Sequence, residues 1–221
     1  MKSNSPPFFK VSYVGLPVGD DLSRACPVIY RSSHFKEPYY IELYDADSST
    51  LIEKTELIDL DIWEGPYQYY IKWKVLIYNH KKKLILSETL ELEGKVVFVS
   101  MSNALGDTIA WIPYIEEFRK KHKCIIICSC KFQDLFIDSY PDIVFINSEA
   151  NPKNIYAQYK LGVAWDGNPV VSPTPFFNIA LQKQGADILG LEYKEISPKI
   201  SVKEYIGNDL PEKYICLSEY S

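Results

Sequence analysis

The amino-acid sequence predicts an α/β fold, a Rossmann-like parallel sheet preceded by a small antiparallel β domain. Up to about Glu93 the apolar residues follow the two-residue period of strands. After Gly94 short apolar strands alternate with helical patterns, and the first of these strands is almost wholly apolar, as in a central parallel strand. We therefore expect a β domain at 1–93, a Rossmann-like domain at 94–212, and the first strand of a truncated further domain at 213–221.

Two hairpins account for most of the predicted β domain. Tyr39–Tyr44 and Thr50–Leu57 flank a turn rich in Asp and Ser, and Gln68–Tyr78 and Lys83–Leu92 flank a second, basic turn. Alternation in the second hairpin predicts one buried and one wet face. The residues expected on one face are Ile71, Trp73, Val75 and Ile77, and those on the other are Tyr70, Lys72, Lys74 and Leu76.

The predicted α/β region contains five strands and three helices, separated by short loops and one long one. The expected strands are Lys95–Ser100, Cys124–Cys128, Ile143–Ile146, Leu161–Trp165 and Lys213–Leu217. The expected helices run from Thr108 to about Lys123, around Phe132–Ser139, and from about Asn178 to Leu189. Pro113 either kinks the first helix or marks a late start of its regular part, and the prolines of the Asp166–Pro175 loop exclude a regular element there.

Composition narrows the class of protein. The chain has 221 residues, 47% of them hydrophobic, enough for a substantial core. The sequence offers neither a membrane-spanning apolar run nor the core of a signal peptide, so the expected location is the cytoplasm. Five cysteines in no dense pattern fit a reducing compartment. A net charge of −5 argues against nucleic acid as the main partner.

The strongest candidate site is the segment between the first parallel strand and its helix. Ligands of open α/β sheets bind at the carboxyl ends of strands, near helix N-termini. Gly106 predicts a tight turn that a ligand can approach closely, and Asp107 is either a helix cap or a catalytic base. The segment has neither Gly-x-Gly-x-x-Gly nor a Gly-Lys-Ser/Thr phosphate loop. The candidate substrate-binding residues here are Ser102, Asn103, Leu105, Gly106 and Thr108, with Trp111 and Trp165 as cleft walls.

Other candidates have a structural and a functional interpretation. Asp166 and Asn168 either bind substrate or form a plain turn. Cys124, Cys128 and Cys130 share one strand face, which is compatible with a metal site but also with a core, and we expect no metal site. An aromatic group, Trp63, Tyr67, Tyr69 and Tyr70, is either a stacking platform or domain packing. Two basic clusters are expected to be solvated, His80–Lys83 in a hairpin turn and Arg119, Lys120, Lys121 and Lys123 at the end of a helix.

The motifs resemble those of the bacterial autotransporter heptosyltransferases, relatives of the lipopolysaccharide heptosyltransferases. The resemblance runs from about Tyr39 to the C-terminus and rests on three strings, SNALGDTIAWIPYIEEFRKKH, FIDSYPDIVFIN and LQKQGADILGLEYKEISPKI. It implies the GT-B fold, in which two Rossmann-like domains face a cleft. It also implies an inverting transfer of heptose from ADP-heptose to Ser or Thr hydroxyls of an autotransporter adhesin passenger.

In that family the aspartate of the Gly-Asp-Thr segment is taken as the general base, which corresponds to Asp107. The resemblance implies a donor domain, with its phosphate-neutralising lysine, beyond Ser221, and Tyr214–Ser221 resembles that domain's first strand. The expectation is an acceptor-side half that is inactive alone, holds no cofactor or iron itself, and assembles as a homo-oligomer. The rival interpretation is a non-catalytic protein- or glycan-binding module.

Overall fold

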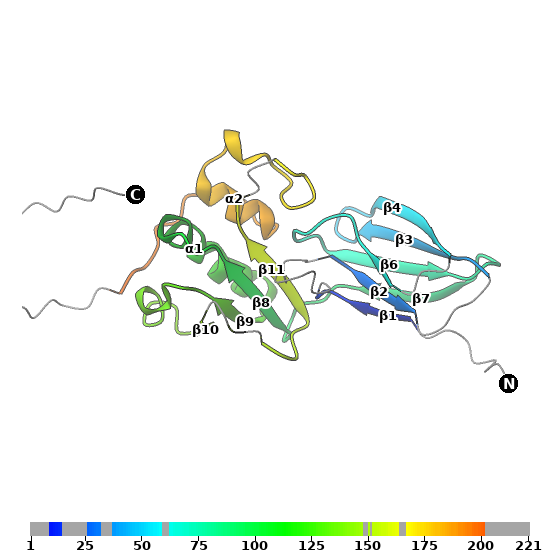
Figure 1. The fold of residues 1–221 in the computed structure, drawn as a ribbon, viewed down its shortest axis with the longest axis horizontal. Helices are drawn as coiled ribbons and strands as arrows, with labels where there is room; N and C mark the ends of the chain where they lie inside the picture. The colour runs from blue at the N-terminus through cyan, green and yellow to red at the C-terminus, as the bar shows by residue number, and fades with distance from the viewer. Residues whose placement is uncertain are drawn as a thin grey trace, which may run out of the picture.

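The computed structural model describes residues 9–14, 26–31, 37–58, 62–147, 150, 152–163 and 167–201. These residues form a β region and an α/β region that lie side by side along the long axis of the molecule (Figure 1). One hydrophobic core runs through both regions. None of the helices in the described ranges is long and apolar enough to cross a membrane.

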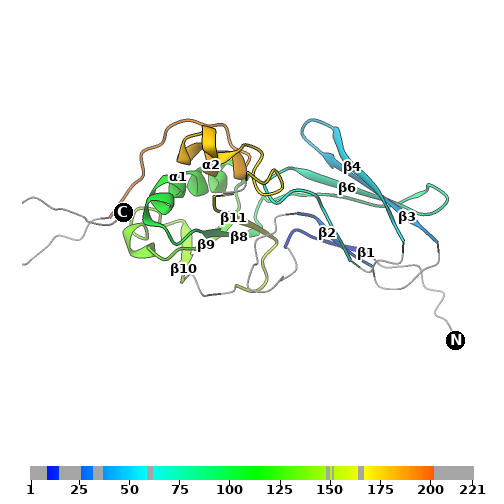
Figure 2. The ribbon, with the colours of Figure 1, turned by 45° about the horizontal axis from the view of Figure 1, so that its top comes forward.

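The β region consists of two antiparallel sheets, as expected of a small β domain. The larger sheet has the order β4-β3-β6-β7 and the smaller the order β1-β2-β5. The two sheets meet face to face, with the ring of Phe9 on β1 5.0 Å from that of Tyr39 on β3 (Figure 2). The strands are β1 (Phe9–Ser12), β2 (Val28–Arg31), β3 (Tyr39–Asp45), β4 (Thr50–Leu57), β5 (Ile62–Glu64), β6 (Trp73–Tyr78) and β7 (Leu84–Thr89).

Alternation places the predicted apolar face of the second hairpin in the core. Trp73, Val75 and Ile77 are fully buried while their neighbours on β6 are only partly so. The first five residues of the predicted strand Gln68–Tyr78 are not part of it, since β6 begins at Trp73. The three strands of the smaller sheet had no counterpart among the predicted elements.

The α/β region is a four-stranded parallel sheet in the order β10-β9-β8-β11. Its strands are β8 (Val96–Met101), β9 (Ile125–Ser129), β10 (Ile143–Ile146) and β11 (Ala157–Leu161). Helices α1 (Leu105–His122) and α2 (Leu181–Ile188) lie on the same face (Figure 2), and the 3-10 turns are η1 (Gln133–Leu135) and η2 (Phe176–Asn178). Numbered along the chain, the strand order 3-2-1-4 is that of a Rossmann half-sheet.

Helix α1 forms because its apolar residues recur every three or four positions. Trp111, Ile112, Ile115 and Phe118 are fully buried against the sheet and α2. The helix starts at Leu105, three residues earlier than predicted, and Pro113 lies inside it. Of the two alternatives for Pro113, a kink or a late start, the late start is therefore excluded.

Three further boundaries differ from the predictions. The strand expected at Leu161–Trp165 lies earlier, at Ala157–Leu161, where it pairs in register with β8. The helix expected around Phe132–Ser139 is one 3-10 turn followed by further turns. The helix expected from Asn178 begins at Leu181. The strand expected at 213–217 lies outside the described residues.

Tyr70 joins the two regions. Its backbone N–H donates to the carbonyl of Ile188 at 2.8 Å, and its ring lies 5.5 Å from that of Phe118 and 4.7 Å from that of His122. Gly190 leaves room for it, since a Cβ there would come within 2.4 Å of the Tyr70 ring. Within 68–72 the ring of Tyr70 packs between the regions, whereas Lys72 forms ion pairs with Asp47 and Glu91. The alternation that predicted a strand here therefore reflects a tertiary contact of Tyr70.

Candidate functional site

The carboxyl edge of the parallel sheet has a topological switch point between β8 and β11. The chain leaves β8 through α1 toward β9, whereas β11 lies on the other side of β8. Met101 pairs with Leu161, so both strands end at the same level. Crevices at such points are where open α/β sheets bind ligands. Ser102–Leu105 borders this point, whereas Trp165 and Asp166, which follow β11, lie outside the described residues.

Hydrogen bonds fix the loop between β8 and α1. The Ser102 hydroxyl donates to Asp107 Oδ2 at 2.8 Å and accepts the backbone N–H of Ala104 at 3.3 Å. The fully buried Thr108 donates its hydroxyl to the Ala104 carbonyl at 2.7 Å, beside its own backbone N–H at 3.1 Å. The loop is thus a defined structure that holds one carboxylate in place.

Asp107 is not the N-cap of α1. Ala104 occupies that position without a side-chain cap hydrogen bond, and Asp107 is the third helical residue. Its carboxylate is half-buried, and Oδ1 accepts no hydrogen bond from the described residues. The neighbouring Asn103 and Leu105 are exposed. A carboxylate with one oxygen held and one oxygen open has the form of a hydrogen-bond acceptor for an incoming hydroxyl.

Two predicted contacts need correction. Trp111 is fully buried, and its indole N–H donates to the Leu181 carbonyl at 2.8 Å. Its ring fits against Gly185, where a Cβ would lie 2.8 Å from the Trp111 Cδ1. Trp111 therefore packs α1 against α2 instead of lining a cleft. Gly106 lies within α1 and is absent from the positive-φ glycines, so the tight-turn explanation was wrong. Among the described residues, no atom beyond its own stretch of helix would lie within 4 Å of a Cβ at Gly106.

The cysteines belong to the core. Cys124, Cys128 and Cys130 are buried, and burial raises the pKa of each thiol, which disfavours the thiolate that metals bind. Within the described ranges no three His, Cys, Asp or Glu residues are grouped so that they could hold a metal ion. These residues do not fit a metal centre.

The remaining candidates are also structural. The ring of Tyr70 packs between the β region and the α/β region, and Tyr67 stacks on Tyr69 with ring centroids 5.2 Å apart. Arg119 forms ion pairs with Glu116 and Asp142 rather than standing alone. Asn168 uses its side chain within its own loop, accepting the N–H of Val170 at 3.0 Å.

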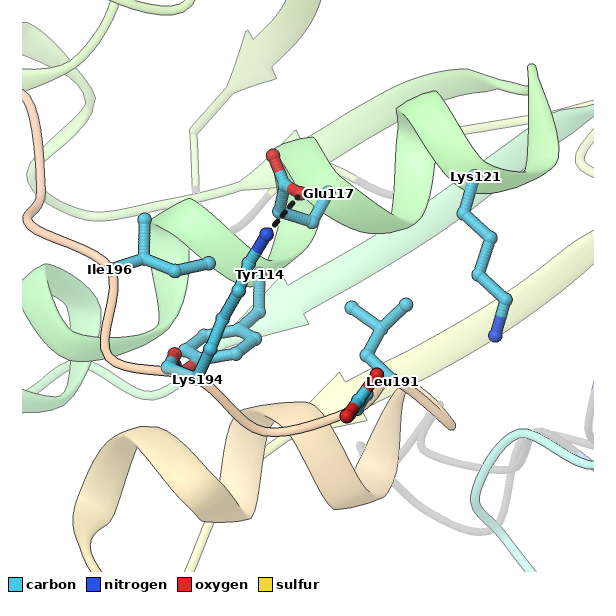
Figure 3. Close-up of a pocket in the computed structure, with 7 residues that line it drawn as sticks. Tyr114, Glu117, Lys121, Leu191, Lys194 and Ile196 are labelled. Atoms are coloured by element: carbon cyan, nitrogen blue, oxygen red, sulfur yellow. Dashed lines mark hydrogen bonds and ion pairs between the residues drawn. The ribbon is translucent and has the colours of Figure 1, made fainter.

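Two cavities flank the segment that crosses α1 after α2, and neither is lined by a predicted site residue. Figure 3 shows the smaller, about 180 Å³, with Lys194 reaching Glu117 at 3.4 Å. The larger, about 300 Å³, lies beside Tyr140 and Asp142. Glu117 is ten positions from Asp107, about 15 Å along the helix. Both cavities are therefore separate from the switch point. The smaller is lined by Tyr114, Glu117, Lys121, Leu191, Glu192, Lys194 and Ile196.

Comparison with known proteins identifies relatives of one kind. No protein-family model matches the sequence. Autotransporter heptosyltransferase Aah of Escherichia coli is 32% identical over 162 residues, which are 70% of this chain and 40% of Aah. Autotransporter heptosyltransferase TibC of E. coli O78:H11 is 25% identical over 189 residues, 83% of this chain and 46% of TibC. Inactive autotransporter heptosyltransferase BimC of Burkholderia thailandensis is 27% identical over 142 residues, 62% of this chain and 33% of BimC.

The fold matches that of TibC. The crystal structure of TibC, an iron-containing dodecameric glycosyltransferase, superposes with a TM-score of 0.77 at 22% identity, covering 90% of this chain and 50% of that chain. A second structure holds TibC in complex with ADP-D-beta-D-heptose, with the same TM-score of 0.77 and the same coverage of 90% and 50%, at 20% identity. At these identities the likeness shows the fold. The iron of TibC has no fitting ligand group among the described residues of this chain.

The homologues and structural neighbours are thus glycosyltransferases, and the match covers less than half the length of Aah, at 40%, and of TibC, at 46%. The region that matches carries the parallel sheet with Asp107 at its switch point. This chain is therefore a homologue of the bacterial autotransporter heptosyltransferases.

Proposed function

We propose that this chain forms the acceptor side of an inverting heptosyltransferase that moves heptose from ADP-heptose to Ser or Thr hydroxyls of an autotransporter adhesin. The observation that carries the proposal is the half-buried Asp107 carboxylate at the switch point, with Oδ2 held by Ser102. The names of the relatives supply the reaction class, and TibC binds ADP-heptose. We further propose that the α/β region is one half of a GT-B fold, that the β region is a domain preceding it, and that the acceptor is an adhesin.

The chemistry needs a base, because a serine or threonine hydroxyl is a weak nucleophile. In the proposed reaction the acceptor hydroxyl donates its hydrogen bond to Asp107 Oδ1. Its oxygen bonds to the anomeric carbon as the bond to ADP breaks on the opposite side, which inverts the configuration, and the proton passes to Asp107. General-base assistance of this kind contributes roughly 100- to 10,000-fold.

The surroundings of Asp107 suit an incoming ligand. Leu105 is 44% exposed, and a Cβ at Gly106 would contact none of the described residues outside its own stretch of α1. The N–H groups of a helix's first turn lack intrahelical partners and carry partial positive charge. We assign the diphosphate of the donor to the part of the relatives' length that this chain does not span.

The test replaces Asp107 with asparagine in the protein produced from its complete reading frame. With ADP-heptose and an adhesin passenger as substrates, Asp107→Asn is expected to lower kcat by about 100-fold or more, since the amide cannot accept the proton. The melting temperature should stay within a few degrees. Glu117→Gln, which changes a carboxylate on the same helix that pairs with Lys194, is the matched control and should keep full activity. Retained transfer by Asp107→Asn with a large loss of stability would identify a structural role.

The second candidate function is a non-catalytic module that binds a protein or a glycan. It is favoured by the relative BimC, which is named an inactive heptosyltransferase. The two candidates separate in one assay, because a binding module retains the adhesin without consuming ADP-heptose, whereas the enzyme consumes it.

We also propose a homo-oligomer, on the likeness to dodecameric TibC, and a cytoplasmic location, on the sequence prediction. Light scattering of the purified protein tests the first, and cell fractionation tests the second.

A further inference from the structure

The hydroxyl of Ser102 makes two hydrogen bonds within the protein, one as donor and one as acceptor. It accepts the Ala104 N–H at 3.3 Å and donates its single proton to Asp107 Oδ2 at 2.8 Å. A hydroxyl has only one proton to donate, so a ligand that accepted a hydrogen bond from Ser102 would have to displace the carboxylate. This arrangement argues against Ser102 as a hydrogen-bond donor to the substrate.

Asp107 is the third residue of α1, a position from which a carboxylate can cap the helix, so its contact with Ser102 competes with capping. An acidic residue at the third position of a helix commonly turns back to accept the backbone N–H of the N-cap residue, as in the capping box. Here the N-cap residue is Ala104, and its N–H already donates to Ser102. Ser102 therefore takes the place that the Asp107 carboxylate would occupy in a cap, and its own proton holds that carboxylate in another direction.

Thr108 stabilises the conformation of the loop at Ala104. Its hydroxyl and its backbone N–H both donate to the Ala104 carbonyl, at 2.7 and 3.1 Å, and its side chain is fully buried. Thr108 thus fixes Ala104, Ala104 orients Ser102, and Ser102 holds Asp107. Each link is a hydrogen bond between residues no more than five positions apart.

We propose that Ser102 is the positioning residue of the base, with Thr108 as its support, and that neither binds substrate. Ser102 prevents Asp107 from capping its own helix and fixes the carboxylate so that Oδ1 faces the acceptor hydroxyl. This inference rests on the proposed role of Asp107 as the base. It predicts that loss of the Ser102 hydroxyl acts through Asp107 alone.

The kinetic test uses Ser102→Ala and Ser102→Thr in the protein from its complete reading frame, with ADP-heptose and an adhesin passenger. Ser102→Ala is expected to lower kcat by about 10- to 100-fold, the cost of misplacing a catalytic group, and to leave both KM values within about threefold. Ser102→Thr, which keeps the hydroxyl, should restore most of the rate. The double variant with Asp107→Asn should be no slower than Asp107→Asn alone.

Two kinetic results would overturn the proposal. A raised KM with an unchanged kcat in Ser102→Ala would mean that Ser102 binds substrate directly. A double variant slower than Asp107→Asn by the full factor of the single Ser102→Ala change would mean that the two residues act independently.

A crystal structure of Ser102→Ala tests the geometry without any activity, and so separates this inference from the proposed function. The Asp107 carboxylate is expected to turn and accept the freed Ala104 N–H, which would also keep the melting temperature near that of the wild type. A carboxylate that keeps its original direction without the Ser102 hydroxyl would refute the positioning role, whatever reaction the protein performs.

Discussion

Gly106→Ala separates a ligand contact from a folding effect more cleanly than any other change in the site. Gly106 lies in the first turn of α1, and a Cβ built there would meet no atom of the described residues within 4 Å beyond its own stretch of helix. The methyl group therefore makes no unfavourable contact with these residues. A ligand that approaches the switch point at Gly106 would meet it.

The expected change in stability is small and favourable. Alanine is better than glycine in a helix by about 0.5–1 kcal/mol, an upper limit at a helix end. For a chain of this size the melting temperature should rise by about 0–4 °C. Gly185→Ala is the contrasting control, because its Cβ would lie 2.8 Å from the Trp111 ring, well inside the optimum carbon–carbon separation. Overpacking of this kind costs about 1–3 kcal/mol.

The assay measures heptose transfer and thermal unfolding on the same preparations. If the acceptor or the sugar approaches the backbone at Gly106, the alanine variant loses at least about tenfold in kcat/KM, a free energy of about 1.4 kcal/mol, while melting at or above the wild-type temperature. A Gly106→Ala variant with wild-type kcat/KM would refute the inference that a ligand reaches this part of the helix.

Two further predictions concern the contact between the regions. Burial lowers the pKa of His122 from 6.5 to about 4, so between these pH values the folded protein binds fewer protons than the unfolded chain. The contribution of neutral His122 to the free energy of unfolding is therefore complete above pH 6.5 and falls as the pH drops toward 4. Allowing for its partial exposure, we expect a loss of at most about 2 kcal/mol, which His122→Phe should abolish in melting curves recorded against pH. Tyr70→Ala should lower the free energy of unfolding in urea by about 2–4 kcal/mol, because it empties the space beside Gly190. Tyr70→Phe, which keeps the ring, should change it by less than about 1 kcal/mol. Equal effects of the two changes would contradict a packing role.

Local patterns predicted the elements whose structure is decided locally. The hairpin of β3 and β4 was predicted almost to the residue, because alternation and a turn suffice to define it. The smaller sheet was missed because β1, β2 and β5 are three or four residues long, and their pairing joins segments far apart in the chain. Residues 68–72 were misassigned to a strand because the ring of Tyr70 packs in a tertiary contact with Phe118, which local alternation cannot distinguish from a strand face.

The same distinction applies to the site. The order of strand and helix located a carboxylate directly after a glycine between β8 and α1, but Asp107 lies inside the first turn of α1 and not before the helix as predicted. Trp111 could not be judged, because its burial depends on Leu181 and Gly185, about 70 residues away. Ser102 was named as a substrate contact, although a serine two residues before an N-cap is also typical of a side-chain turn onto the backbone, which is how it is used here.

Whether Asp107 is a cap or a base depends on the N-cap residue itself. Serine or aspartate at that position would stabilise α1 by about 0.5–2 kcal/mol relative to alanine, yet the chain has Ala104 there, with no side-chain cap hydrogen bond. The helix thus forgoes the usual N-cap, and the Ala104 N–H, which Asp107 could have capped, is satisfied by Ser102 instead. Helix α2 also begins after an alanine, Ala180, without a side-chain cap hydrogen bond, so the missing cap alone does not mark a site. What distinguishes α1 is the carboxylate at its third position, which accepts the Ser102 hydroxyl beside the switch point instead of capping the helix.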